Sequence, residues 1–206
     1  MASTAPFLSA PDRKVQASFT ANHPDWSQYS FTLTTGATTG LSAGDTVMSF
    51  RTGTGTGFWL PTIVAVQVAQ VTAFGAAKVN TLDLYIARSF TASDTGGVAA
   101  TLTGNNGKSR TADASTTIAD FRVANTATLT AGTRTLDAQR YAFLGASHST
   151  TANASILART SILAFTDAFE VLAANEGLIV QVGLAYPATG TWTMTFNVQW
   201  QECPNW

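Results

Sequence analysis

The stretch TWTMTFNVQWQ, residues 191–201, decides the fold because polar and apolar residues alternate along it without a break. One side of an extended chain carries Trp192, Met194, Phe196, Val198 and Trp200, and the other side carries only Thr, Asn and Gln. Successive side chains of a β-strand point to opposite faces, so the segment is predicted to be a long amphipathic strand. Its polar side has no charge, which suits contact with a neighbouring protein at least as well as contact with water. We therefore take Thr193, Thr195, Asn197 and Gln199 as candidate interface residues.

The composition also favours an assembled protein. Charged residues make up 11 % of the chain, against roughly 25 % in ordinary soluble domains. Disorder does not explain the low charge, because 45 % of the residues are hydrophobic and the net charge is only −1. A monomer with so few charges risks edge-to-edge pairing of its strands. We expect much of the surface to be covered in a homo-oligomer, with a trimer favoured, or in a larger particle.

Several partner classes are disfavoured by the same numbers. With only eleven Lys and Arg residues, the chain offers no basic patch for nucleic acid or for an anionic membrane. No apolar run reaches the roughly eighteen residues of a membrane span, and the start MASTAPFLSAPDRK does not resemble a secretory signal. Cys203 is the only cysteine and cannot form an internal disulfide. We expect synthesis in a reducing cytoplasm.

Along the chain, short alternating segments follow a proline-containing lead-in. Residues 1–25 are predicted to be an extended N-terminal arm, and residues 26–206 a single domain. Strands are expected at 29–34, 46–50, 63–71, 82–86, 98–102 and 121–123. Residues 63–71 are apolar or small on both faces and are expected near the middle of a sheet. The fold class is therefore all-β, an antiparallel β-sandwich of jelly-roll type with little helix, and residues 136–144 are the only candidate helix.

Two turns are predicted from local sequence. Asn106-Gly107 is typical of a type I′ turn, in which both central residues have positive φ. Near the C-terminus, Pro187 and Gly190 fall between two alternating segments and indicate a hairpin closed by residues 187–191. Because opposed residues share a face, the expected pairs are Tyr186 with Trp192, Leu184 with Met194, and Val182 with Phe196.

No motif in the sequence supports an active site. Gly40-Leu41-Ser42-Ala43-Gly44 matches the G-x-S-x-G pattern, but the next residues alternate like a strand, whereas a nucleophile elbow needs a helix there. His23 and His148 are the only histidines and have no ligand spacing for zinc, so surface or interface roles are expected for both.

Other candidate sites are equally weak. GTGTG (53–57) lacks the third glycine or the lysine of a nucleotide loop and is interpreted as a flexible turn. Asp94 and Asp113 have no acidic companions at calcium-loop spacing, and Asn153-Ala154-Ser155 is a glycosylation sequon without a secretory signal. We assign no catalytic residue, no cofactor and no metal ligand, and we expect a protein that is not an enzyme.

The tryptophans leave one alternative open. Trp192 and Trp200 lie on the apolar side of the strand and are expected in the core. Trp26, Trp59 and Trp206 are expected in the core or in a subunit interface, and the alternative is that they stack on sugars.

Three stretches together resemble a family of virion structural proteins, often minor components, encoded by tailed bacteriophages. They are LDLYIARSFTASDTGGVAATLTGNNGKSRT (82–111), ANTATLTAGTRTLDAQ (124–139) and LAANEGLIVQVGLAYPATGTWTMTFNVQWQE (172–202). The resemblance implies a location in the virion and partners among the major capsid protein or other virion proteins. It brings no catalytic motif with it.

We therefore expect a phage virion protein, and first of all a capsid cement or decoration protein that bridges major-capsid subunits. One alternative is a neck, collar or tail adaptor, and a second is a glycan-binding receptor module that uses Trp26, Trp59 or Trp206.

Overall fold

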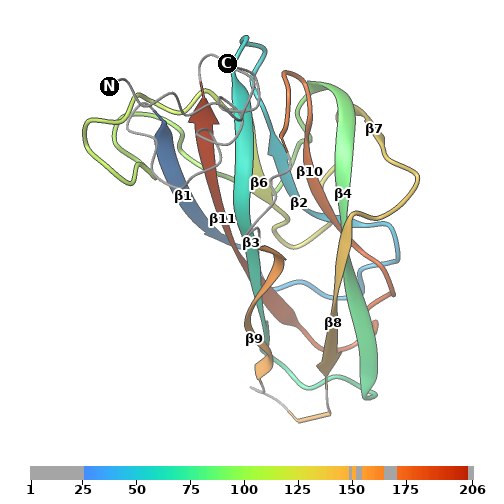
Figure 1. Cartoon of the computed structure of the whole chain (residues 1–206). Coiled ribbons are helices and arrows are strands. Elements are labelled where there is room, and N and C mark those ends of the chain that lie inside the picture. The colour runs from blue at the N-terminus through green and yellow to red at the C-terminus, as the bar shows by residue number, and fades with distance from the viewer. Residues whose placement is uncertain (1–25, 149, 152–154, 165–170, 204–206) are drawn as a thin grey trace, which may run out of the picture.

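The structure is a computed structural model that describes residues 26–148, 150–151, 155–164 and 171–203 (Figure 1). Its strands form two antiparallel β-sheets packed face to face, with no helix among these residues. The predicted all-β sandwich is confirmed. The sheets contain four and seven strands, and this order does not establish the jelly-roll connectivity. The predicted N-terminal arm, residues 1–25, lies outside the described residues.

Sheet A, the four-stranded sheet, contains most of the alternating stretch 191–201 in an interior strand. Its order is β1-β11-β3-β9. The strands are β1 (Ser27–Thr34), β11 (Trp192–Cys203), β3 (Phe58–Gln70) and β9 (Ser155–Ala164). β11 pairs with β3 along its whole length, and alternate side chains of β11 are buried. Since β3 lies between β11 and β9, the prediction that residues 63–71 belong inside a sheet is also confirmed.

Sheet B is wider and is organised around the long strand β4 (Lys78–Ala92). Its main order is β5-β6-β2-β10-β4-β7. The other strands are β5 (Val98–Ala99), β6 (Asp120–Val123), β2 (Thr46–Arg51), β10 (Gly177–Val182), β7 (Thr133–Leu136) and β8 (Ala142–His148). β8 pairs with residues 78–84 of β4, and β7 pairs with residues 87–92.

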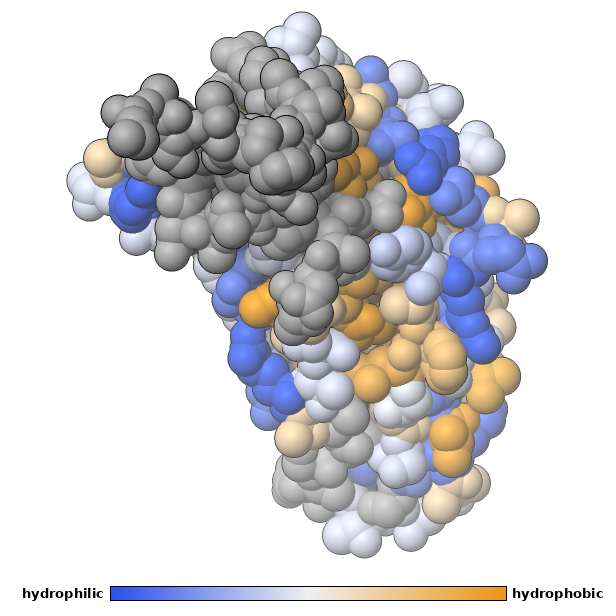
Figure 2. All heavy atoms as spheres, viewed as in Figure 1, coloured by the Kyte–Doolittle hydropathy of each residue, from blue (hydrophilic) through white to orange (hydrophobic). Residues whose placement is uncertain are grey.

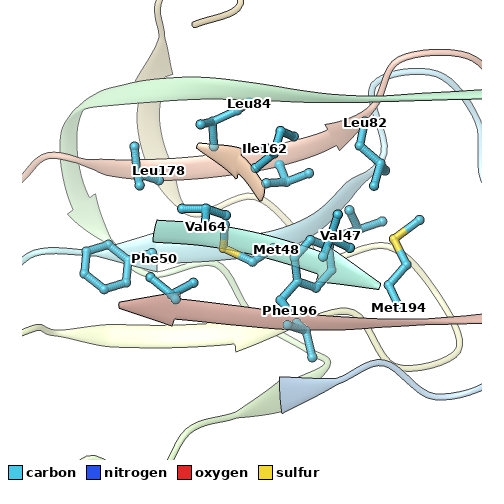
Figure 3. Packing of buried hydrophobic residues seen from close by; sticks show 14 of the residues in the cluster. Val47, Met48, Phe50, Val64, Leu82, Leu84, Ile162, Leu178, Met194 and Phe196 are labelled. Atoms are coloured by element: carbon cyan, nitrogen blue, oxygen red, sulfur yellow. The ribbon is translucent and has the colours of Figure 1, made fainter. Parts of the chain in front are cut away.

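The inward faces of the two sheets share one apolar core (Figure 3). Side chains from β2, β4 and β10 point toward side chains from β3, β9 and β11. The labelled members are Val47, Met48, Phe50, Leu82, Leu84 and Leu178 from sheet B, and Val64, Ile162, Met194 and Phe196 from sheet A. The alternation that defines each strand therefore also decides which of its faces is buried.

The predicted C-terminal hairpin is wrong. β10 pairs with β2 and β4 in sheet B, whereas β11 belongs to sheet A. Val180 lies opposite Met48 and Leu84, and Leu184 is 50 % exposed. A hairpin in one sheet and a connection between two packed sheets both bring the apolar faces of two strands together. Alternation alone does not distinguish a hairpin from a connection between sheets. The positive φ predicted for Gly190 is present, at 91°.

The predicted helix at residues 136–144 is also wrong, because these residues contribute to β7 and β8. β4 is long enough to pair with two strands on one side, and this pairing overrides a weak helical stripe. Burial along β8 has period two: Ala146 and His148 are buried, whereas Phe143 is exposed. Of the expected strand at 98–102, only Val98–Ala99 forms.

The turn at Asn106-Gly107 exists, but it is not of type I′. Only Gly107 has positive φ, 70°. The loop packs on β1 instead, where the Ser30 N–H donates to the Gly107 carbonyl at 2.8 Å. A Cβ atom on Gly107 would lie 1.9 Å from the Phe31 ring, so the close approach of loop and strand requires glycine.

Candidate interaction surface

The outward side of sheet A forms one surface, which we call the amide face. Opposed residues of antiparallel strands share a face, so the register places Thr195 with Gln67, and Asn197 with Thr32. The amide face consists of Ser30, Thr32 and Thr34 from β1, Thr193, Thr195, Asn197 and Gln199 from β11, Ile63, Ala65, Gln67 and Ala69 from β3, and Arg159 and Ser161 from β9.

All four candidate interface residues lie on the amide face. Thr193, Thr195, Asn197 and Gln199 are half-buried rather than fully solvated. Three of these side chains are held by neighbours: the hydroxyl oxygens of Thr195 and Thr34 lie 2.9 Å apart in a hydrogen bond, and Gln199 donates to Asn197. A surface of ordered hydroxyl and amide groups loses less conformational entropy when it is covered than a surface of free lysines and glutamates would lose.

Asn197 is the centre of the hydrogen-bond network on the amide face. Its Nδ2 donates to Ser30 Oγ at 3.1 Å and to Thr32 Oγ1 at 3.0 Å. Its Oδ1 accepts from Arg159 Nη2 at 3.0 Å and from Gln199 Nε2 at 3.2 Å. These contacts join β1, β11 and β9, and they fix the position of the Arg159 guanidinium.

Arg159 is the one charged residue of the amide face, and it forms no ion pair with any described residue. The ion pairs among the described residues lie off this face: Arg88 with Asp137 and Glu176, Arg110 with Asp113, Arg122 with Asp120, Arg134 with Asp94, and Arg140 with Asp83. The amide face thus has one positive charge and no carboxylate.

A hollow of about 370 Å³ opens on the amide face. Arg159 and Asn197 line it together with Thr32, Ala65, Gln67, Thr195 and Gln199. Among the described residues, the lining is dominated by hydroxyl, amide and guanidinium groups and contains no aromatic ring. Such a lining matches polar and anionic groups rather than an apolar ligand.

The outer side of sheet B has a second surface, which we call the apolar strip. It consists of Val79, Tyr141 and Phe143, with Val79 60 % and Phe143 58 % exposed. Figure 2 shows apolar residues at the surface over β8 and the lower part of β4. The Arg140 guanidinium lies 4.2 Å from the centre of the Phe143 ring. Sequence reasoning missed this strip because it placed Tyr141 and Phe143 in a helix.

The segment around Ser42 has the geometry of a turn. Ser42 is exposed, and its N–H donates to Asp45 Oδ2 at 2.7 Å. Strand β2 begins at Thr46, directly after this turn. A nucleophile elbow would continue into a helix, whereas this turn leads into a strand, as the alternation after Gly44 predicts.

His148 is buried, which contradicts its expected place on a surface. It ends β8, it is 5 % exposed, and its ring lies 4.5 Å from the Phe74 ring and 5.3 Å from the Tyr186 ring. Desolvation lowers the pKa of His148, and the positive charge of Lys78 lowers it further. His23 lies outside the described residues. No group of three or more His, Cys, Asp or Glu residues that could hold a metal ion occurs in the described part of the chain.

Asp94 and Asp113 are both engaged in ion pairs. Asp94 is fully buried, and its Oδ1 accepts from the Arg134 Nε at 2.9 Å and from the Gly132 N–H at 2.8 Å. Asp113 accepts from the Arg110 Nε at 2.9 Å. Residues 153 and 154 of the glycosylation sequon lie outside the described residues. In GTGTG (53–57), the first glycine is buried and the middle is exposed.

The tryptophans in the described part of the chain are all buried. Trp192 and Trp200 lie in the main core, as predicted. Trp26 and Trp59 are buried as well, so neither presents a broad ring face for sugar stacking. Trp206 lies outside the described residues.

Glu202 is a buried carboxylate that sequence reasoning missed. Its oxygens accept hydrogen bonds from the Thr117 N–H at 2.9 Å, the Thr117 hydroxyl at 2.7 Å and the Trp200 indole at 2.9 Å. Thr116 donates a further hydrogen bond. The alternation of 191–201, extended by one residue, would have placed Glu202 on the buried side. The carboxylate anchors the loop at 114–118 to β11, beside a hollow of about 340 Å³ that Tyr29 and Trp59 help to line.

Comparisons with known proteins add no relative. No family model, no curated protein and no solved structure matches the chain. Within the described residues, no helix is long and apolar enough to cross a membrane.

Proposed function

We propose that the chain is a structural protein of a tailed-bacteriophage virion, and that it acts as a capsid cement or decoration protein bridging major-capsid subunits. The observation that carries the proposal is the amide face, an outward sheet surface with Arg159 as its single charged residue. The centres of protein interfaces are depleted in charged residues. A surface of this composition therefore suits burial against another protein.

A bridging protein needs at least two contact surfaces, and the sandwich offers two on opposite sheets. The amide face belongs to sheet A, and the apolar strip belongs to sheet B. Exposed large apolar side chains such as Val79 and Phe143 gain free energy when a neighbour covers them. Buried area and strand-face contacts on both sides would tie adjacent subunits together against the pressure of packaged DNA.

The sequence resemblance to phage structural proteins supports the virion as the location, with the major capsid protein or another virion protein as partner. A homo-oligomer, with a trimer favoured, would present several copies of each surface and so strengthen attachment by multivalency. A neck, collar or tail adaptor could use the same two surfaces, and the two roles differ in copy number.

The proposal is tested with particles of the encoding phage assembled without this protein. On heating, these particles should release DNA at a lower temperature than complete particles, and purified protein added back should restore the higher temperature. Equal release temperatures for the two kinds of particle would contradict a cement role.

A further inference from the structure

We propose that the hollow on the amide face binds a carboxylate side chain of a neighbouring virion protein, with Arg159 as its cationic partner. The identity of the neighbour rests on the proposed function. The chemistry of the site rests on the residues of the hollow itself.

The Arg159 guanidinium is held in place by Asn197 and has N–H donors left for a ligand. A guanidinium carries five N–H donors in a planar fork that matches the two oxygens of a carboxylate. Among the described residues, only Asn197 Oδ1 accepts a hydrogen bond from Arg159, at 3.0 Å. Asn197 is itself held by Ser30 and Thr32, so its hydrogen bond tethers the guanidinium in the lining of the hollow. The exposed amide of Gln67, on the adjacent strand β3, supplies a further donor in the lining of the hollow.

The complementary carboxylate does not come from the described surface of a second copy. Every described aspartate except Asp45 is ion-paired within its own chain, as is Glu176. Asp45 accepts the Ser42 N–H, and Glu202 is buried. Because the described carboxylates are engaged in this way, we assign the bound carboxylate to a partner of different sequence. Its acidic residue would approach a face that has one positive charge and no negative charge to repel it.

An acidic protein segment fits the hollow better than an acidic saccharide. Sugar rings gain much of their binding energy by packing their apolar faces on aromatic rings, and none of the described residues that line the hollow is aromatic. Its lining belongs to neighbouring rows of hydroxyl and amide groups on β1 and β11, and Gln67 of β3 adds a further amide. An extended peptide laid along these rows would present every second side chain to the face.

The test uses the intact protein in solution, so that its outcome does not depend on the virion. Three probes are titrated: an acetylated Glu-Ser-Glu-Ser-Glu peptide, the matching Gln-Ser-Gln-Ser-Gln peptide, and trigalacturonate. Two-dimensional NMR follows the side-chain N–H signals of Arg159, Asn197 and Gln199. The glutamate peptide should shift these signals, and the glutamine peptide should not.

Three variants assign the effect to Arg159. Arg159→Gln should weaken binding of the glutamate peptide by at least about tenfold, the value expected for losing a hydrogen bond to a charged group. Arg159→Lys keeps the positive charge but lacks the planar fork of N–H donors. Its affinity for the glutamate peptide should lie between that of the unchanged protein and that of Arg159→Gln. Lys78→Gln, on sheet B, changes the net charge equally and should leave binding unchanged. The thermal unfolding midpoint of each variant confirms that it is folded.

Two outcomes would overturn the inference: the absence of signal shifts with the glutamate peptide, or shifts produced by trigalacturonate alone. The proposed function would survive either outcome if the protein is abundant on the capsid. Conversely, binding of the peptide at Arg159 in a protein absent from the capsid would refute the proposed function while leaving the carboxylate site in place.

Discussion

The rings of Tyr186 and Trp192 stack at a centroid distance of 4.3 Å, although the strands beside them belong to different sheets. Tyr186 follows β10 of sheet B, and Trp192 begins β11 of sheet A. The stack continues from Tyr186 to His148 at 5.3 Å. It closes the end of the sandwich where the chain passes from one sheet to the other.

Replacing Trp192 by Ala should strongly destabilise this end of the sandwich. The indole is fully buried, and removing a buried tryptophan costs about 3–5 kcal/mol. Tyr186→Phe keeps the stacked ring and removes a buried hydroxyl that has no hydrogen-bond partner among the described residues. Its free energy of unfolding should change by less than about 1 kcal/mol or rise. Urea unfolding measures the free energy of unfolding of both variants. Equal losses would contradict the claim that the stacked rings, and not the Tyr186 hydroxyl, stabilise this end of the sandwich.

The Asp94–Arg134 ion pair should contribute far more to stability than the Asp137–Arg88 ion pair. The first pair is almost fully buried, whereas both side chains of the second are about two-fifths exposed. Asp94→Asn leaves a buried guanidinium without its counter-charge and should cost about 3–5 kcal/mol. Asp137→Asn should cost less than about 1 kcal/mol. Chemical denaturation compares the two, and the account of sheet B fails if their costs are similar.

The stability of the protein should fall in mildly acidic solution because of His148. Desolvation and Lys78 lower the pKa of His148 below the ordinary value of 6.5. The unfolded chain therefore binds a proton more readily than the folded chain, and the free energy of unfolding decreases as pH falls below 6.5. His148→Phe keeps a ring in the stack and should show a flatter profile from pH 7 to pH 5. Identical slopes in urea unfolding would rule out His148 as the source.

The sequence alone correctly predicted the strands whose alternation of polar and apolar residues is compatible with only one kind of secondary structure. β11, β1 and β3 alternate strongly, so their faces follow from period two. The predicted contact between Tyr186 and Trp192 is correct as a contact but wrong as a strand pair, because both arrangements bury the same faces. Residues 136–144 could not be assigned locally, since their strand form depends on pairing with β4, far away in sequence.

Part of the amide face was also predictable from the sequence, because alternation along one strand fixes which residues share a face. Thr193, Thr195, Asn197 and Gln199 share a face by parity along one strand. Arg159 could not be placed beside Asn197 from sequence, because the register of β9 against β3 contains irregularities. The apolar strip depended on β8, which was not predicted.

A negative charge introduced on the amide face should weaken attachment to the particle without unfolding the protein. Thr195→Glu places a carboxylate in the lining of the hollow, where it would repel an acidic neighbour and would have to be desolvated under any covering protein. Thr126→Glu, in an exposed loop, is the matched control. Co-sedimentation with particles assembled without the protein should show at least about tenfold weaker binding for Thr195→Glu only. Equal binding of both variants would remove the amide face from the contact.

The copy number of the protein in purified virions tests the central claim most directly. A cement protein that bridges capsid subunits should be present at on the order of hundreds of copies per particle, because the shell repeats its subunits by symmetry. Quantitative mass spectrometry against the major capsid protein gives this number. A copy number of about six or twelve, as expected for a ring at the neck or tail, would contradict the cement role.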